Sequence, residues 1–191
     1  MKKRLNFNRA VLSAVSLGFL IATVPAMAAD GEVTFNGNVL ATTCTIGAGG
    51  GAVGDRNMTV KLPSVSVSAL AKAGDIAGRT PFSILLTGCT GGSTKVSAVF
   101  EPGDTVDSST GRLKLISTGD TDTVAKNVEI NLLNSSQKPL RAGVASGQQN
   151  SQVVTLKDGG ATLTYFAEYY ATGTATAGSA NTRVQYSLDY Q

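Results

Sequence analysis

The chain contains no histidine and no tryptophan, and it has two cysteines and five prolines in 191 residues. Histidine is the side chain most often used in acid–base catalysis and in zinc sites, so its absence removes the usual basis for both. No Gly-x-Ser-x-Gly stretch occurs that could form a nucleophile elbow. The sequence therefore predicts a protein that is not an enzyme and that takes no cofactor, metal or small-molecule substrate.

Charged residues are scarce, at 15% of the chain, and the basic ones are unevenly placed. Four of the 16 lysines and arginines lie at the start, so the rest of the chain holds 12 basic against 13 acidic residues. These four are Lys2, Lys3, Arg4 and Arg9. No basic cluster remains that could bind a phosphate backbone or an anionic membrane, so nucleic acid is not an expected partner.

One long hydrophobic run is present, from Ala10 to Val24, directly after the basic start. Pro25 ends it, and the small-x-small triplet Ala26-Met27-Ala28 follows. This order is typical of a secretory signal peptide. A membrane anchor is the alternative, but a run of about 15 residues is short for a hydrocarbon core that needs about 20. We expect residues 1–28, or one residue more, to be removed and the remainder to be exported.

Both cysteines, Cys44 and Cys89, lie in the part that we expect to be exported. An even number of cysteines in an oxidising compartment indicates a disulfide. Closing a loop of about 46 residues would stabilise the fold by about 4 kcal/mol in the chain-entropy model. Two free thiols, or half of a metal site, are the alternatives that the sequence leaves open.

Helical periodicity is nearly absent, and apolar residues alternate with polar ones over short runs, which is the period of a β-strand. Turn-forming stretches such as Asp158-Gly159-Gly160 separate these runs, and 68–73 alone suggests a helical turn. The predicted strands are Val33–Thr45, Thr59–Leu62, Pro81–Thr87, Lys95–Phe100, Arg112–Ile116, Asn127–Leu133, Gln152–Leu156, Ala161–Ala171 and Thr182–Tyr190. The expected fold is one all-β domain, a β-sandwich, with Pro63 and Pro81 at strand ends.

The two ends of the exported part show the alternation most clearly. Near its start, one face of an extended strand would carry Gly31, Val33, Phe35, Gly37 and Val39. Near its end, one face would carry Val184, Tyr186, Leu188 and Tyr190. An edge strand that pairs within its own chain would explain the first pattern, and this plain alternative stays open on the pattern alone.

At these residues the chain resembles the pilin subunits of the chaperone–usher pathway, above all the major rod subunits of the type 1 kind. The stretch Val33-x-Phe35-x-Gly37-x-Val39 before Cys44 is similar to that family's donor strand, and Phe82-x-Ile84-x-Leu86 before Cys89 resembles the strand with the second cysteine. The C-terminal pattern also matches, with Gly178 fourteenth from the end and Tyr190 penultimate. Further matches, in the family's order, lie at 127–133, 138–140 and 165–173.

The resemblance implies an incomplete immunoglobulin-like β-sandwich that lacks its last strand and is completed by donor-strand exchange. In that family a periplasmic chaperone first fills the gap, and an outer-membrane usher then replaces it with the N-terminal extension of the next subunit. Residues 29–40 would be the donor-strand extension and 41–191 the pilin domain. The residues expected to border the groove are Gly178, Val184, Tyr186, Leu188 and Tyr190.

The function that the resemblance implies is that of a structural subunit of a surface fimbria, which supports cell adhesion by polymerising with copies of itself and related pilus subunits. A minor or adaptor subunit and a carbohydrate-binding adhesin are alternatives within the same kind of filament. The adhesin would carry an extra N-terminal lectin domain, for which the chain has no room. Outside the family, a monomeric secreted binding sandwich is the remaining alternative.

Overall fold

The structure is a computed structural model that describes residues 34, 39, 41–49 and 56–191. The predicted signal peptide, 1–28, lies outside the described residues, as do four of the five predicted donor positions. Val39 is the fifth, and its side chain is fully exposed. All of the strands belong to one unit, Asn38–Gln191. Among the described residues, no helix has the length and hydropathy needed to span a membrane.

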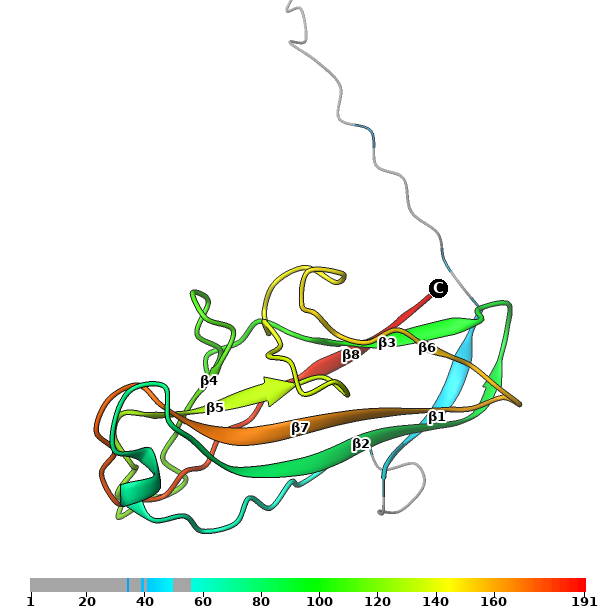
Figure 1. The fold of residues 1–191 in the computed structure, drawn as a ribbon. Helices are drawn as coiled ribbons and strands as arrows, with labels where there is room; N and C mark the ends of the chain where they lie inside the picture. The colour runs from blue at the N-terminus through cyan, green and yellow to red at the C-terminus, as the bar shows by residue number, and fades with distance from the viewer. Residues whose placement is uncertain (1–33, 35–38, 40, 50–55) are drawn as a thin grey trace, which may run out of the picture. The chain divides into compact units, whose positions relative to one another are not determined.

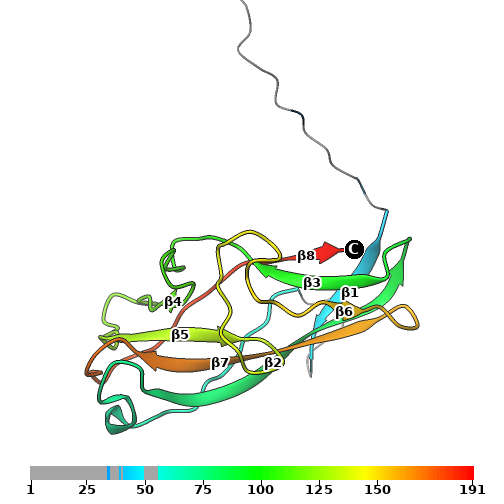
Figure 2. The same cartoon turned by 45° about the horizontal axis from the view of Figure 1, so that its top comes forward.

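Two antiparallel sheets form the domain, and Figures 1 and 2 show them as two layers. The five-stranded sheet has the order β1-β2-β7-β5-β4 and the three-stranded sheet the order β6-β3-β8. One 3₁₀ turn, η1 (Val67–Leu70), precedes β2. The strands are β1 (Thr43–Ala48), β2 (Ile76–Thr90), β3 (Lys95–Phe100), β4 (Leu113–Lys114), β5 (Val128–Leu133), β6 (Val154–Thr155), β7 (Ala161–Ala171) and β8 (Tyr186–Tyr190).

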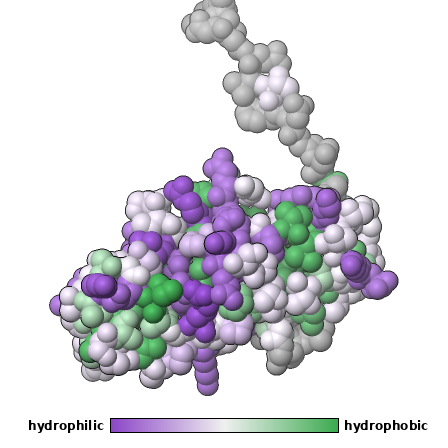
Figure 3. Space-filling view, in the orientation of Figure 1, coloured by the Kyte–Doolittle hydropathy of each residue, from purple (hydrophilic) through white to green (hydrophobic). Residues whose placement is uncertain are grey.

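The core lies between the two sheets, because each strand turns one set of alternate side chains inward. Its largest fully buried residues include Ile84 and Leu86 of β2, Val96 of β3, and Leu163 and Tyr165 of β7. On the face shown in Figure 3, hydrophobic side chains gather in patches among hydrophilic ones, and one of these patches lies at the end that holds η1. The all-β fold class and the sandwich are as predicted.

A tight turn connects β6 of the small sheet to β7 of the large sheet. Asp158 and Gly159 have φ values of 50° and 73°, and the Lys157–Gly160 bridge closes the loop around them. Two consecutive positive φ angles define the type I′ turn, whose twist matches that of antiparallel strands. The turn predicted from Asp158-Gly159-Gly160 is confirmed.

The two cysteines form the disulfide Cys44–Cys89, which joins β1 to the end of β2. Beside it, the hydroxyl of Thr42 donates to that of Ser93 at 2.9 Å, and the amide of Ser93 donates to Thr42 at 3.3 Å. Gly91, at φ +108°, lies so close that an added Cβ would stand 2.7 Å from the Cα of Thr42. These contacts fix the place where the N-terminal part of the chain joins the domain.

Two predictions about local structure were wrong. The segment Thr59–Leu62 is not a strand in the structure, although its apolar side chains alternate. Pro81 lies inside β2 instead of at a strand end. Proline is tolerated there because β1 leaves β2 at Ala48, opposite Ile84, so the position of the missing Pro81 amide faces a side of β2 with no paired strand among the described residues.

Candidate functional site: an open groove beside β8

The last strand, β8, is an edge strand. It pairs with β3 in the register Phe100↔Tyr186 to Val96↔Tyr190, and among the described residues no strand pairs with its other side. The amide of Gln191 donates to the carbonyl of Lys95, on the β3 side. Because alternate residues of a strand point their backbone groups to opposite sides, those of Leu188 and Tyr190 point away from β3. An edge of this kind is a template for another strand.

The inward-facing side chains of β8 and of the residues before it are only partly covered. Those of Val184, Tyr186, Leu188 and Tyr190 pack against the core, yet none of them is fully buried. Burial raises the pKa of the Tyr190 phenol above its usual value. The side chains of the alternate residues, such as Gln185 and Ser187, are exposed. The predicted inward face of this strand is therefore correct, and it lines an opening.

A groove of about 600 Å³ runs between the residues before β8 and the extended segment Met58–Leu62. One wall comes from 180–184 and Tyr186, and the other from 58–62. The floor is the apolar core itself, which both sheets contribute to. Its members are Phe82, Ile84, Phe100, Leu113, Ile130, Leu132, Ala167 and Tyr169. Side chains of the sandwich interior are therefore accessible to solvent, or to another chain, through the groove.

A second cavity, of about 1070 Å³, continues the groove along β8. It shares Met58, Arg183, Val184 and Tyr186 with the first cavity. Leu188, Tyr190 and Ile46 extend it toward the end of β8. The two cavities together form one channel that follows the strand from its approach at Asn181 to Tyr190.

The fifth residue predicted to border the groove, Gly178, lies elsewhere. It precedes β8 and packs against the backbone of 123–125, where an added Cβ would stand 2.5 Å from the carbonyl oxygen of Thr123. The neighbouring Ser179 pairs with Val124 in a parallel bridge. The residue at 178 must therefore be small so that this segment can lie along 123–125, and the described geometry gives it no place in the groove lining.

Replacing Gly178 by alanine is expected to destabilise the domain, because the added methyl group would collide with the backbone of Thr123–Ala125. Overpacking of this kind typically costs about 1–3 kcal/mol. Chemical denaturation of the purified domain would measure the loss. Gly103 is a matched control, because an added Cβ there meets no atom within 4 Å. A Gly178→Ala variant as stable as Gly103→Ala would show that the close approach is not rigid.

Sequence reasoning missed the second wall and most of the floor. Met58, Val60 and Leu62 alternate as a strand would, and the structure places this segment alongside the groove with no strand partner among the described residues. Its alternation was a usable signal for a strand-like wall. The floor residues come from β2, β3, β4, β5 and β7, and no local pattern indicates that they meet under an opening.

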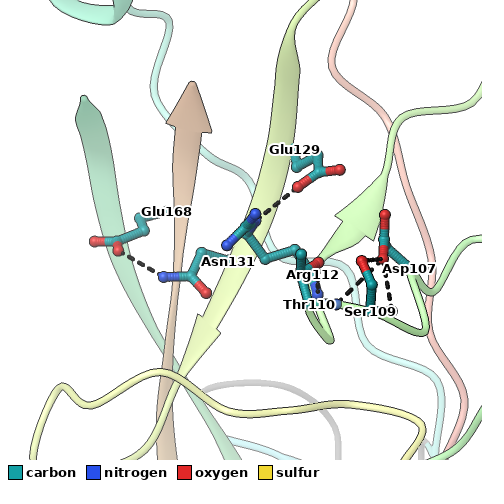
Figure 4. A network of polar contacts seen from close by, with 7 residues as sticks. All are labelled: Asp107, Ser109, Thr110, Arg112, Glu129, Asn131 and Glu168. Carbon is teal, nitrogen blue, oxygen red and sulfur yellow. Dashed lines mark hydrogen bonds and ion pairs between the residues drawn. The ribbon is translucent and has the colours of Figure 1, made fainter. Parts of the chain in front are cut away.

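A group of polar residues outside the groove is paired internally. On the face of the large sheet turned away from the core, Arg79 Nε lies 2.8 Å from Glu168 Oε2. Asn131 donates to Glu168 Oε1 at 3.0 Å (Figure 4). Arg112 Nε lies 2.6 Å from Glu129 Oε2. Because these five side chains pair with one another through hydrogen bonds and ion pairs, we assign them a structural role on this face of the sheet.

An acidic loop beside this network is also internally satisfied. Hydrogen bonds from Ser109 to the carboxylate hold the pKa of Asp107 below its usual value, and the Ser109 hydroxyl donates at 2.6 Å (Figure 4). In the part of the chain that the structure describes, no three acidic or cysteine side chains gather as a metal site would require. Within the described residues, no segment of the chain occupies the groove.

A family model described as "Type-1 fimbrial protein, A" matches residues 62–191, which include the groove floor and β8. The chain is 47% identical over 173 residues to the major fimbrial subunit SMF-1 of Stenotrophomonas maltophilia strain K279a, covering 88% of this chain and 97% of that protein. This chain belongs to the type-1 fimbrial protein family. The fimbrial subunit is also 41% identical over 182 residues to the F17 fimbrial protein of Escherichia coli, covering 92% and 96% of the two chains.

Solved structures show the same fold for this fimbrial subunit. A subunit from a chaperone–usher pilus superposes with a TM-score of 0.56 at 21% identity, covering 89% of this chain and 99% of that one. The P pilus rod subunit PapA gives a TM-score of 0.55 at 20% identity, covering 78% and 99%. The fold is therefore the incomplete immunoglobulin-like sandwich of pilins.

Family membership decides between the functions considered above. The fimbrial subunit is a structural component of a surface-displayed pilus, which polymerises with other pilus subunits, and it is not an enzyme. The monomeric secreted sandwich is excluded. The relative in Stenotrophomonas maltophilia is a major fimbrial subunit, which disfavours the adaptor and adhesin alternatives.

Proposed function

We propose that this subunit polymerises head-to-tail by donating residues 29–40 as a strand to the groove of a neighbouring copy. The observation that supports the proposal most directly is the open edge of β8 above an apolar groove. A strand laid there would pair with the backbone of β8 and cover the core beneath it, which is β-augmentation. Because the donor end and the groove are different surfaces, the contact repeats without closing and builds a filament.

The donor strand runs antiparallel to β8 in this proposal, since every strand pair of the small sheet is antiparallel. Side chains of directly opposed residues point to the same face, so inward donor positions must face inward positions at and before β8. The register that we propose places the three large donor side chains on the groove, with Val33 opposite Tyr190, Phe35 opposite Leu188, Gly37 opposite Tyr186 and Val39 opposite Val184. The small residue of the donor then lies beside a large aromatic ring.

Burial of the three large donor side chains supplies the driving force. Covering Val33, Phe35 and Val39 would stabilise the complex by about 5–9 kcal/mol as an upper estimate, at about 1.5–3 kcal/mol for each side chain. Backbone pairing along β8 adds to this. Displacing the strand would return both the donor side chains and the groove floor to water, so the junctions of the filament are long-lived.

The resemblance to pilins of the chaperone–usher pathway implies two helper proteins, and the open groove is consistent with a need for them. After export and cleavage behind Ala28, the groove of a new subunit exposes apolar side chains and a strand edge, both of which favour aggregation. A periplasmic chaperone would cover the groove until an outer-membrane usher exchanges it for residues 29–40 of the next subunit. The exported domain, 41–191, is thus an acceptor, and the extension before it is the donor.

A self-complemented variant tests the donor role and the strand direction together. In this variant residues 29–40 are removed from the front, and a copy of 30–40 is attached after Gln191 through a short flexible linker. A short linker forces the copy to return antiparallel along β8. We expect a soluble monomer with a raised melting temperature that needs no chaperone.

The matched control carries the same attachment with Val33, Phe35 and Val39 changed to serine. It keeps the length and the linker but removes the side chains that would enter the groove. We expect it to aggregate like the chain without an attachment. Equal melting temperatures for the two variants would contradict the donor-strand proposal.

A further inference from the structure

An exposed apolar tip lies at one end of the domain. We define the η1 pole as residues 65–76 together with the loop 172–175. Val67 and Ile76 of this pole are 46% and 49% exposed. The side chains of Ala69, Ala71 and Ala73 between them are also exposed, and Figure 3 shows hydrophobic side chains gathered at this end. An apolar cluster on a soluble domain indicates an interaction surface.

The tip is held firmly in place. Leu70 is buried, and its carbonyl accepts from the amide of Ala175 at 3.1 Å. The amide of Gly74 donates to the carbonyl of Ala171 at 2.9 Å. Asp75 accepts from the amide of Lys72 at 3.0 Å. Val67 and Ile76 are therefore presented outward by a folded turn, and their exposure is a fixed property of the pole.

The opposite end of the domain has a complementary surface. We define the disulfide pole as residues 42–45 and 89–94, which surround Cys44–Cys89. Neither stretch contains a charged residue, and Thr43, Thr90, Gly91 and Gly92 are exposed. Val67 and Ile76 can be buried against these small, uncharged residues without removing a charge of the disulfide pole from water.

The strand β2 separates the two poles. It runs from Ile76 at the η1 pole to Thr90 at the disulfide pole, and its 15 residues span about 45 Å at about 3.3 Å per residue. The two poles of one molecule therefore cannot touch each other. Contact between them requires a second copy of the chain.

The direction of the donor strand brings the two kinds of pole together. With Val39 opposite Val184, the donor leaves the groove near Asn181 of the acceptor. Followed backwards from Asn181 through Ser179, the acceptor's own chain reaches Ala175 in its η1 pole. The next copy's own domain begins at its Cys44, five residues after Val39. Five extended residues reach at most about 17 Å.

We propose that the η1 pole of each subunit docks on the disulfide pole of the next copy, with Val67 and Ile76 buried in the contact. This proposal rests on the proposed donor-strand function, which supplies the direction and the short tether. The contact is separate from the groove. It sets the angle between successive subunits and limits bending at each junction.

Cross-linking tests which poles meet. Val67→Cys and Gly92→Cys are introduced together, because Val67 is exposed and an added Cβ at Gly92 meets no atom within 4 Å. Filaments treated with a short bismaleimide are expected to give a ladder of covalent multimers in denaturing gels. Each single-cysteine variant should give no ladder, because a head-to-tail contact joins different poles. Assembled filaments of the double variant that give no ladder would overturn the proposal.

A second pair of variants separates this contact from donor-strand exchange. Filaments of Val67→Ser with Ile76→Ser are expected to assemble but to bend more, with a shorter persistence length in negative-stain images. Val153→Ser is the control, since Val153 is 51% exposed but lies before β6, away from this pole. Wild-type stiffness in the double variant would contradict the pole contact. Failure of donor-strand exchange would instead remove filaments altogether.

Discussion

Deleting residues 30–38 is expected to abolish filaments while leaving a folded, exported subunit. The deletion removes Val33, Phe35 and Gly37 from the proposed donor strand but keeps the predicted cleavage site and the whole acceptor groove. Such a subunit can accept a strand but cannot offer one, so no junction forms between copies that all carry the deletion. Negative-stain microscopy of material sheared from the cell surface would show the loss, and immunoblots of the periplasm would show the retained subunit.

Two full-length variants are matched controls for this deletion. Changing Val33, Phe35 and Val39 to serine should reproduce the loss of filaments without shortening the chain. Changing Thr34, Asn36 and Asn38 to alanine alters the other face of the same strand and should leave filaments normal. Filaments of normal length from the deletion would contradict the donor role of these residues.

The sequence predicted the bounds of two central strands correctly. Lys95–Phe100 and Ala161–Ala171 have the predicted bounds, as β3 and β7. Each of them is central in its sheet, with a strand on both sides. Its alternation of apolar and polar residues therefore reflects a strand that is paired on both edges and packs one face on the core. For such strands the pattern and the tertiary structure agree.

Prediction failed where the partner of a strand-like segment is missing. The alternation at Thr59–Leu62 is that of a strand, but the groove lies along the segment, and no strand in the described part of the chain pairs with it. An alternating pattern shows which side chains face the core, and it does not show which molecule supplies the pairing strand. The extended wall at Met58–Leu62 is consistent with a strand whose partner comes from another chain.

The sequence predicted one wall of the candidate groove but not its floor, for a similar reason. The inward positions at and before β8 follow from local alternation, and four of the five predicted residues line the groove. Gly178 does not, because its small size serves the packing against Thr123–Ala125, which no local pattern reveals. The floor residues are contributed by five strands, so only the assembled sandwich shows that they meet.

Changing Leu188 and Tyr190 together to asparagine is expected to lower the periplasmic level of the subunit sharply. Both side chains pack against the core and line the second cavity, and their backbone groups point to the open edge of β8. Losing two such apolar contacts would cost about 3–6 kcal/mol, which is comparable with the whole stability of many domains. The altered β8 would also be a poorer surface for any incoming strand, from the chaperone or from another subunit.

The matched control changes the opposite face of the same strand. Gln185→Asn with Ser187→Asn alters two exposed side chains next to Tyr186 and leaves the inward ones untouched. Periplasmic immunoblots, normalised to a second exported protein, should show depletion of the Leu188/Tyr190 variant alone. Because the altered subunit lacks core packing as well as a surface for the incoming strand, proteolysis should remove it before assembly. Equal levels of the two variants would contradict the assignment of these residues to the acceptor groove.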